Sequence, residues 1–184
     1  APVFSMAKLV GVDWHLGPEM KSTGEVMGVD RNFQMALTKA LMAANLEIKP
    51  GTGVLLSIAD QHKAEAVSLI RDLTAAGCLL YATEGTAAMI SAMGLSVSMT
   101  TKRLSEGHPN VTDVIEDGSV SAVVNTISGS PEVMRDGFYI RRAAVEKHIP
   151  CFTSMDTARA AAESLSVELA AYNIATIGEY LKAD

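Results

Sequence analysis

Short apolar runs alternate with helical patterns over most of the chain. Runs typical of strands lie at residues 54–58, 78–82, 95–99, 120–124 and 151–153. Between them, apolar residues at helical spacing predict a helix that follows Asp60 and stops at Gly77, and a short helix over 87–93 that ends at Gly94. A third helix is capped by Asn110 with Gly118 beyond it, a fourth spans 138–148, and Asp156 caps a last helical region. Strands separated by helices favour parallel pairing with right-handed crossovers. We therefore predict an α/β fold, a doubly wound five-stranded parallel sheet, with the flavodoxin-like strand order 2-1-3-4-5 or a variant of it.

The first fifty residues have a different pattern. Residues 16–28 form a glycine-punctuated polar segment without a period, and Asp30 then precedes a helical stretch with Phe33 and Leu41 on its apolar face. Residues 47–52, punctuated by Pro50 and Gly51, have the composition of a short linker. We place a domain boundary there, which divides the chain into residues 1–49 and 50–184.

Composition narrows the function classes. With 184 residues, 48% of them hydrophobic, the chain is long enough to form a hydrophobic core without disulfide bonds or a structural metal ion. Its net charge of −6 argues against a non-specific nucleic-acid binder. No apolar run approaches the roughly 20 residues that cross a bilayer, and the first residues do not resemble a secretory signal. Cys78 and Cys151 each lie in an apolar stretch, as buried thiols do. These features favour the cytoplasm, with an organelle interior left open, and no membrane or nucleic-acid partner.

The loops at the carboxyl edge of the predicted sheet carry the candidate chemistry. Ligands of open parallel sheets bind outside this edge. Residues 83–86 pass from a strand into a helix start, where backbone N–H groups and the helix dipole favour an anion. Such a short motif alone is more often a simple turn, but five loops of the same character indicate a phosphate-bearing ligand. The polar and glycine residues of these loops are Ser57, Lys63, Thr83, Gly85, Thr86, Lys102, Asn125, Thr126, Ser128, Gly129 and Thr153.

Other chemistry finds little support in the residues. The sequence has no nucleophile elbow, and neither cysteine has a histidine nearby. Arg141 and Arg142 are adjacent and diverge on a helix, so at most one of them faces the body of the protein; by default we interpret each as a docking contact or a solvated charge. No metal site is predicted, because the histidines lack the spacing of metal ligands; they are His15, His62, His108 and His148.

Several stretches together resemble the carboxyl-terminal end of the large subunit of carbamoyl-phosphate synthase. The resemblance implies that residues 1–49 are the tail of the preceding ATP-grasp domain with a linker. It implies that residues 50–184 are a regulatory domain with the methylglyoxal-synthase-like fold. The stretches that carry it are residues 16–28, Leu79–Thr86, Glu106–Asn110, Val123–Thr126 with Ser128 and Gly129, and Ile140–Ala143.

The resemblance also implies a function. In bacterial relatives this domain binds UMP as inhibitor and IMP as activator, and ornithine binds between it and the neighbouring domain. It implies nucleotide-phosphate contacts at Ser57, Lys63, Thr83, Thr86 and Lys102, a base or ribose contact at Asn125 and an ornithine contact at Thr153. It further implies a non-catalytic part of a glutamine-hydrolysing ligase of pyrimidine and arginine synthesis. The partners would be the rest of the large subunit and the small glutaminase subunit, and ATP with magnesium or manganese would bind outside this region.

This chain departs from the family pattern at three places. Ile127 stands where nucleotide-responsive relatives have a hydroxyl, residues 130–131 replace two basic residues, and Cys151 replaces an aromatic residue at the ornithine contact. The effector, UMP, IMP, ornithine or none, is therefore left open. Two other functions are left open as well. One is a lyase like methylglyoxal synthase, although the loop 100–109 lacks the aspartates of that enzyme; the other is a docking module without effector response. Self-association through residues 1–47 is left open as well.

Overall fold

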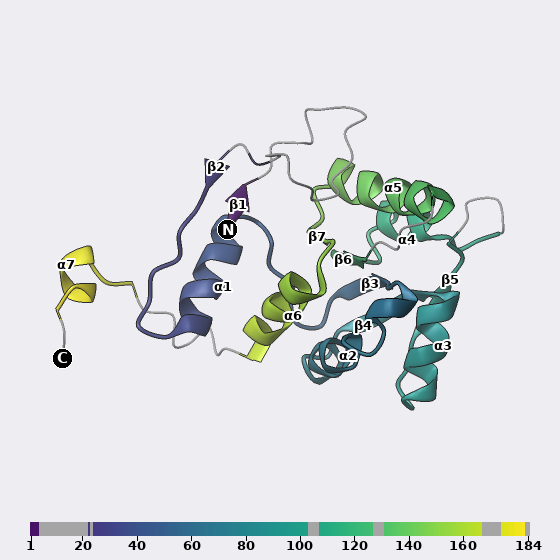
Figure 1. The fold of residues 1–184 in the computed structure, drawn as a ribbon, viewed down its shortest axis with the longest axis horizontal. Helices are drawn as coiled ribbons and strands as arrows, with labels where there is room; N and C mark the ends of the chain where they lie inside the picture. Colours follow the sequence, from purple (N-terminus) through teal and green to yellow (C-terminus); the bar gives the residue numbers. More distant parts are fainter. Residues whose placement is uncertain (4–21, 23, 103–106, 127–130, 167–173, 183–184) are drawn as a thin grey trace.

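A five-stranded parallel sheet forms the centre of the molecule (Figure 1). The computed structural model describes residues 1–3, 22, 24–102, 107–126, 131–166 and 174–182. Nearly continuous apolar runs form four of these strands, as expected for a sheet that is covered on both faces. The strand predicted at residues 95–99 lies instead at residues 98–100, where only Met99 is apolar. The strands are β3 (Gly53–Ser57), β4 (Leu79–Thr83), β5 (Ser98–Thr100), β6 (Ala122–Asn125) and β7 (Cys151–Phe152).

The strand order corrects one prediction. Neighbouring strands run β5-β4-β3-β6-β7, which is 3-2-1-4-5 in chain order and not 2-1-3-4-5. The chain adds β4 and β5 outward from β3, then crosses back to pair β6 with the free side of β3. Strand patterns fix which residues form a strand but not the side on which the next strand is added. The switch point therefore lies between β3 and β6, whose carboxyl ends are side by side.

Helices cover both faces of the sheet (Figure 1). Leu55 and Val123 point toward α4 and α5, whereas Val54 and Leu56 lie in a second buried cluster with α2, α3 and α6. This alternation follows the period of two along each strand. The helices are α1 (Phe33–Ala43), α2 (Ala66–Ala75), α3 (Glu84–Ala92), α4 (Val111–Glu116), α5 (Pro131–Glu146), α6 (Met155–Glu163) and α7 (Ile177–Tyr180). Shorter elements are the antiparallel pair β1 (Pro2–Val3) and β2 (Gly24–Glu25), and the 3₁₀ turns η2 (Asp60–His62) and η3 (Ser164–Ser166).

The predicted caps are partly confirmed. Gly77 follows α2 at φ +74°, a conformation that glycine adopts without strain. Asn110 caps α4 in a capping box with Asp113. The prediction for α1 was wrong: the cap is not Asp30 but Asn32, whose Oδ1 accepts a hydrogen bond from the Met35 N–H at 3.3 Å.

Three other predicted boundaries also differ from the structure. Helix α3 begins directly after β4, so residues 83–86 form its first turn and not a separate turn. Helix α5 begins at Pro131 instead of residue 138, and proline is well tolerated at a helix start because the missing N–H has no intrahelical partner there. Asp156 lies in the first turn of α6 and Ser154 holds its N-cap position.

The amino-terminal segment contacts the sheet domain. Helix α1 packs against α6, and Leu41 and Ile48 belong to the same buried cluster as Val54. The boundary between residues 49 and 50 stays a prediction. Among the described residues no helix is both long and apolar enough to cross a bilayer, and neither Cys78 nor Cys151, both of which are described, is joined in a disulfide.

Candidate functional site

Four polar residues lie at one level across four adjacent strands. Ser57 at the end of β3 is opposite Asn125 at the end of β6, and Thr83 at the end of β4 is opposite Thr100 at the end of β5. The pairing of β3 with β4 puts Ser57 and Thr83 at the same level, one residue beyond their last paired positions. Thr100, Thr83, Ser57 and Asn125, in this order, therefore form a polar row along the carboxyl edge of the sheet.

The polar row faces α4 and α5, because its side chains alternate with those of the opposite buried cluster. All four residues are buried. Among the described residues, Thr100 Oγ1 has no hydrogen-bond partner, Thr83 makes no capping bond to α3, and only Oδ1 of the Asn125 amide is bonded. A buried polar group without a partner costs free energy, and a site that binds a polar ligand is one reason to keep it. The row thus presents donors at the edge where the sequence predicts a ligand.

Two other predicted residues are bonded to the backbone. The Thr86 hydroxyl accepts a hydrogen bond from Ile58 N at 3.1 Å and donates one to Ile58 O at 3.4 Å. The Thr126 hydroxyl accepts a hydrogen bond from Ala59 N at 2.8 Å. Both side chains therefore fix the loop that follows β3 against the ends of α3 and β6, and they shape the rim of the site.

A lysine lies at the amino terminus of α3. A Cβ added to Gly85 would be 3.2 Å from Lys63 Nζ, so the ammonium group sits against the first turn of the helix. Lys63 Nζ is 2.7 Å from Asp60 Oδ1, and this hydrogen bond lowers the pKa of the Asp60 carboxyl. The Asp60 side chain is 94% exposed, so the ion pair is a weak surface contact. The helix terminus and the ammonium group present positive charge at one place, which suits an incoming anion.

The remaining predicted residues lie around this edge. Lys102 is half-buried just beyond β5, and Thr153 is half-buried after β7, the strand next to β6. Ser128 and Gly129 lie outside the described residues, as does Ile127. The structure thus brings residues from β3, β4, β5 and β6 to one edge.

The interpretation of Arg141 was wrong. Its side chain is fully buried, and Nη1 donates a hydrogen bond to Asn125 Oδ1 at 2.9 Å. Arg142 does point outward and pairs with Glu146 at 2.7 Å. The signal that could have found Arg141 is its spacing: it lies four residues after Gly137 and three before Ala144, on the buried face of α5.

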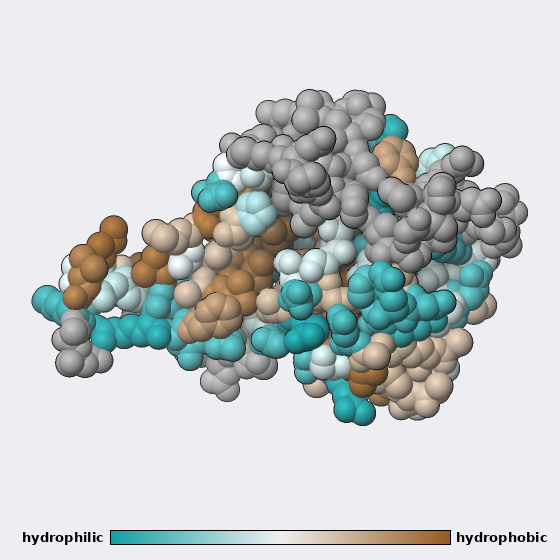
Figure 2. Space-filling view, viewed as in Figure 1, coloured by the Kyte–Doolittle hydropathy of each residue, from teal (hydrophilic) through white to brown (hydrophobic). Residues whose placement is uncertain are grey.

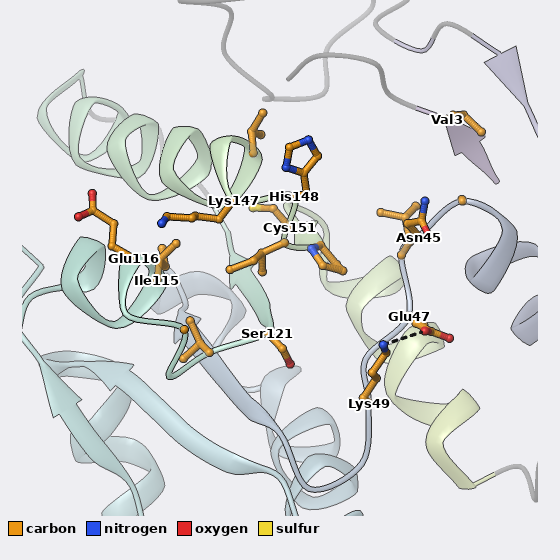
Figure 3. A pocket seen from close by; sticks show the side chains of 17 residues that line it. Val3, Asn45, Glu47, Lys49, Ile115, Glu116, Ser121, Lys147, His148 and Cys151 are labelled. Atoms are coloured by element: carbon orange, nitrogen blue, oxygen red, sulfur yellow. Dashed lines mark ion pairs between the residues drawn. The ribbon is translucent and has the colours of Figure 1, made fainter. Parts of the chain in front are cut away.

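Another cavity lies at the opposite edge of the sheet (Figure 3). It measures about 690 Å³ and is lined at the amino ends of β3, β6 and β7 by residues such as Lys49, Ser121 and Cys151. Its charged side chains are solvated, as in the pair of Lys49 with Glu47 at 3.6 Å, whereas the polar row is buried. A buried polar atom without a hydrogen-bond partner indicates a ligand site more strongly than the size of a cavity does. The polar row, which contains Thr100 Oγ1, is therefore the better candidate site. No group of three or more metal-ligating side chains occurs in the described residues.

Comparison with known proteins agrees with this fold. The MGS-like domain family matches residues 65–153. Residues 65–153 form an MGS-like domain. The carbamoyl phosphate synthase large chain of Thermomicrobium roseum is 55% identical over 165 residues, which cover 90% of this chain and 15% of that relative. The predicted resemblance to the carboxyl-terminal domain of this large subunit is therefore confirmed, and so is the predicted α/β fold.

Proposed function

We propose that the chain is a regulatory domain of a carbamoyl phosphate synthase large chain. It binds a phosphorylated nucleotide, UMP or IMP, and thereby controls ATP-dependent synthesis of carbamoyl phosphate for pyrimidine and arginine biosynthesis. The observation that supports this proposal is the polar row: four buried polar residues at the carboxyl edge, of which Thr100 keeps a buried hydroxyl without a hydrogen-bond partner among the described residues. The 55% identity to a carbamoyl phosphate synthase large chain, over 90% of this chain, supports the proposal that the control acts on that enzyme.

The phosphate would bind at the amino terminus of α3. The first N–H groups of a helix have no intrahelical partner, and the helix dipole adds positive charge. Gly85 leaves room for close approach, and Lys63 would exchange its exposed Asp60 partner for the phosphate. Lys102 and the Thr83 hydroxyl add further donors. Thr153, which directly follows β7, is the proposed ornithine contact.

Control requires a second arrangement of the whole enzyme that binds the effector with a different affinity. The rest of the large chain is the proposed partner for this, and the small glutaminase subunit acts through it. Exposed apolar side chains of the α7 segment give this partner a surface to contact (Figure 2). They are Ile174, Ile177 and Leu181. ATP and its magnesium or manganese ion would bind in the part of the large chain outside these residues, in the cytoplasm.

Calorimetric titration of UMP, IMP, ornithine and inorganic phosphate into the 184-residue chain tests the proposal. Lys63→Ala and Lys102→Ala should each weaken nucleotide binding by about 10- to 150-fold, the scale of a charged hydrogen bond. Lys147→Ala is the matched control, because Lys147 is exposed and lines the cavity at the opposite edge. Nucleotide binding at wild-type affinity in Lys102→Ala would refute the phosphate site.

The same titration separates the other functions. A docking module without effector response gives no heat with any of the four ligands. A lyase turns over dihydroxyacetone phosphate in a direct assay, and this activity would replace the regulatory proposal.

A further inference from the structure

Arg141 is a charged side chain inside the sheet domain. It is fully buried, and Ile140 and Ala144, which lie close to it in α5, belong to the buried apolar cluster beneath this helix. Moving a guanidinium group out of water is costly, so a buried arginine needs hydrogen-bond partners. One of them is Asn125 Oδ1, at 2.9 Å from Nη1. The contact joins α5 to the last residue of β6, at the end of the polar row.

This contact fixes the orientation of the Asn125 amide. A guanidinium group carries only donors, so the atom that faces it must be the carbonyl oxygen. Asn125 Nδ2 therefore points away from Arg141, and it has no hydrogen bond among the described residues. The amide can offer a ligand an N–H group and no acceptor.

Gly137 makes the contact sterically feasible. A Cβ at this position would lie 2.6 Å from Arg141 Nη1 and 3.1 Å from Asn125 Oδ1. A separation below 3.0 Å is shorter than a van der Waals contact, so any larger residue would displace the guanidinium group. The absence of a side chain at residue 137 thus preserves the orientation of the Asn125 amide.

The position of Asn125 indicates which part of a ligand it reaches. Neighbouring strands lie about 4.8 Å apart, so β6 is roughly 10 Å from β4, where α3 begins. Inorganic phosphate cannot span this distance, whereas a nucleoside monophosphate can. A phosphate at α3 therefore leaves its sugar or base beside Asn125.

We infer that Arg141 is a positioning residue for ligand specificity. Through Gly137 and the Asn125 amide, it makes the site select nucleotides whose base or sugar presents a hydrogen-bond acceptor. This inference rests on the proposed function, because it takes the phosphate to bind at α3. Arg141 itself touches no ligand in this assignment.

Two variants disturb the orientation without touching the phosphate site. Arg141→Lys removes the planar fork and keeps the charge, and Gly137→Ala displaces Nη1 while keeping every polar group. Each should weaken UMP binding about tenfold or more and change the affinity for inorganic phosphate less than twofold. Gly178→Ala is the matched control, since its added Cβ would meet only Thr176 Oγ1, at 4.0 Å.

A side-chain amide signal provides a readout that a purely structural role would not change. In ¹⁵N spectra the Asn125 NH₂ resonance, assigned by its loss in Asn125→Asp, should shift with UMP and stay unchanged with phosphate. In Gly137→Ala the UMP shift should be lost. Asn125→Asp keeps an acceptor for Arg141, so it should fold and bind UMP at least tenfold more weakly.

The outcomes separate the two ideas. If the wild-type chain binds phosphate but UMP no better, or binds neither, the nucleotide proposal fails and this inference with it. If the wild type binds UMP and both Gly137→Ala and Asn125→Asp bind it equally well, the inference alone is wrong. Equal losses of UMP and phosphate affinity in Gly137→Ala would also overturn it, because they indicate general distortion of the site.

Discussion

The same substitution, threonine to valine, at Thr100 in the polar row and at Thr86 outside it tests whether the Thr100 hydroxyl is without a partner. Both residues are about 1% exposed, and valine replaces the hydroxyl of either by a methyl group of similar size. Thr100 Oγ1 has no hydrogen-bond partner among the described residues, so its burial costs free energy in the ligand-free protein. Thr100→Val removes this cost. We expect it to raise the free energy of unfolding by about 1–3 kcal/mol.

Thr86→Val should have the opposite effect. The Thr86 hydroxyl accepts the hydrogen bond from Ile58 N, and valine leaves that N–H buried without an acceptor. The expected loss is about 1–3 kcal/mol, so the two variants should differ in stability by about 2–6 kcal/mol. For a chain of this length, each 1 kcal/mol corresponds to a shift of about 2–4 °C in Tm.

Urea unfolding followed by circular dichroism measures both stabilities, and calorimetry with UMP measures binding. Thr100→Val should combine higher stability with weaker UMP binding, because the hydroxyl it removes is proposed to face the ligand. A Thr100→Val variant destabilised as much as Thr86→Val would refute the reasoning. Its hydroxyl would then have a partner in the folded chain, and the row would not be a set of unused donors.

Three further predictions concern local structure. Asn110→Ala removes the cap of α4 and should lower the free energy of unfolding by about 1 kcal/mol in urea, whereas unchanged stability would mean that the capping box contributes nothing. The Asn110 N–H and His108 lower the pKa of Asp113, so its contribution to stability is present above the usual carboxyl pKa of about 3.9 and is lost as pH falls through the lowered pKa. Urea midpoints should therefore fall less between about pH 5 and 2 in Asp113→Asn than in the wild type, and equal slopes would contradict this. Burial raises the pKa of the Cys78 thiol, so it should react with a thiol reagent at pH 7 more slowly than the half-buried Cys151, and equal rates would argue against its burial.

The sequence predicted most of what depends on neighbouring residues. Apolar runs predicted four strands of the sheet closely and the fifth, β5, three residues too early, and Gly77 and Gly94 ended helices at positive φ as expected. The cap of α4 could also be predicted, because the capping box depends on two residues, Asn110 and Asp113, that are only three positions apart in the sequence. Boundaries were less certain where two candidates compete, as for Asp30 and Asn32 at the start of α1.

The carboxyl edge of the sheet was also predictable as the place of the candidate residues. In a parallel sheet every strand ends at the same edge, so the residues after each strand must gather there whatever the strand order. For this reason Ser57, Thr83 and Asn125 could be assigned to one site before the order was known.

The tertiary structure alone decided which of these residues are available to a ligand. Register put Thr100 in line with Thr83 and left its hydroxyl without a hydrogen-bond partner in the described part of the chain, whereas the Thr86 hydroxyl bonds to the Ile58 backbone. The tertiary structure also buried Arg141 against Asn125, whereas the sequence had favoured a docking contact or a solvated charge for this arginine. Hydrogen-bond partners and burial arise from contacts between distant segments, and residue type and spacing along the chain do not encode them.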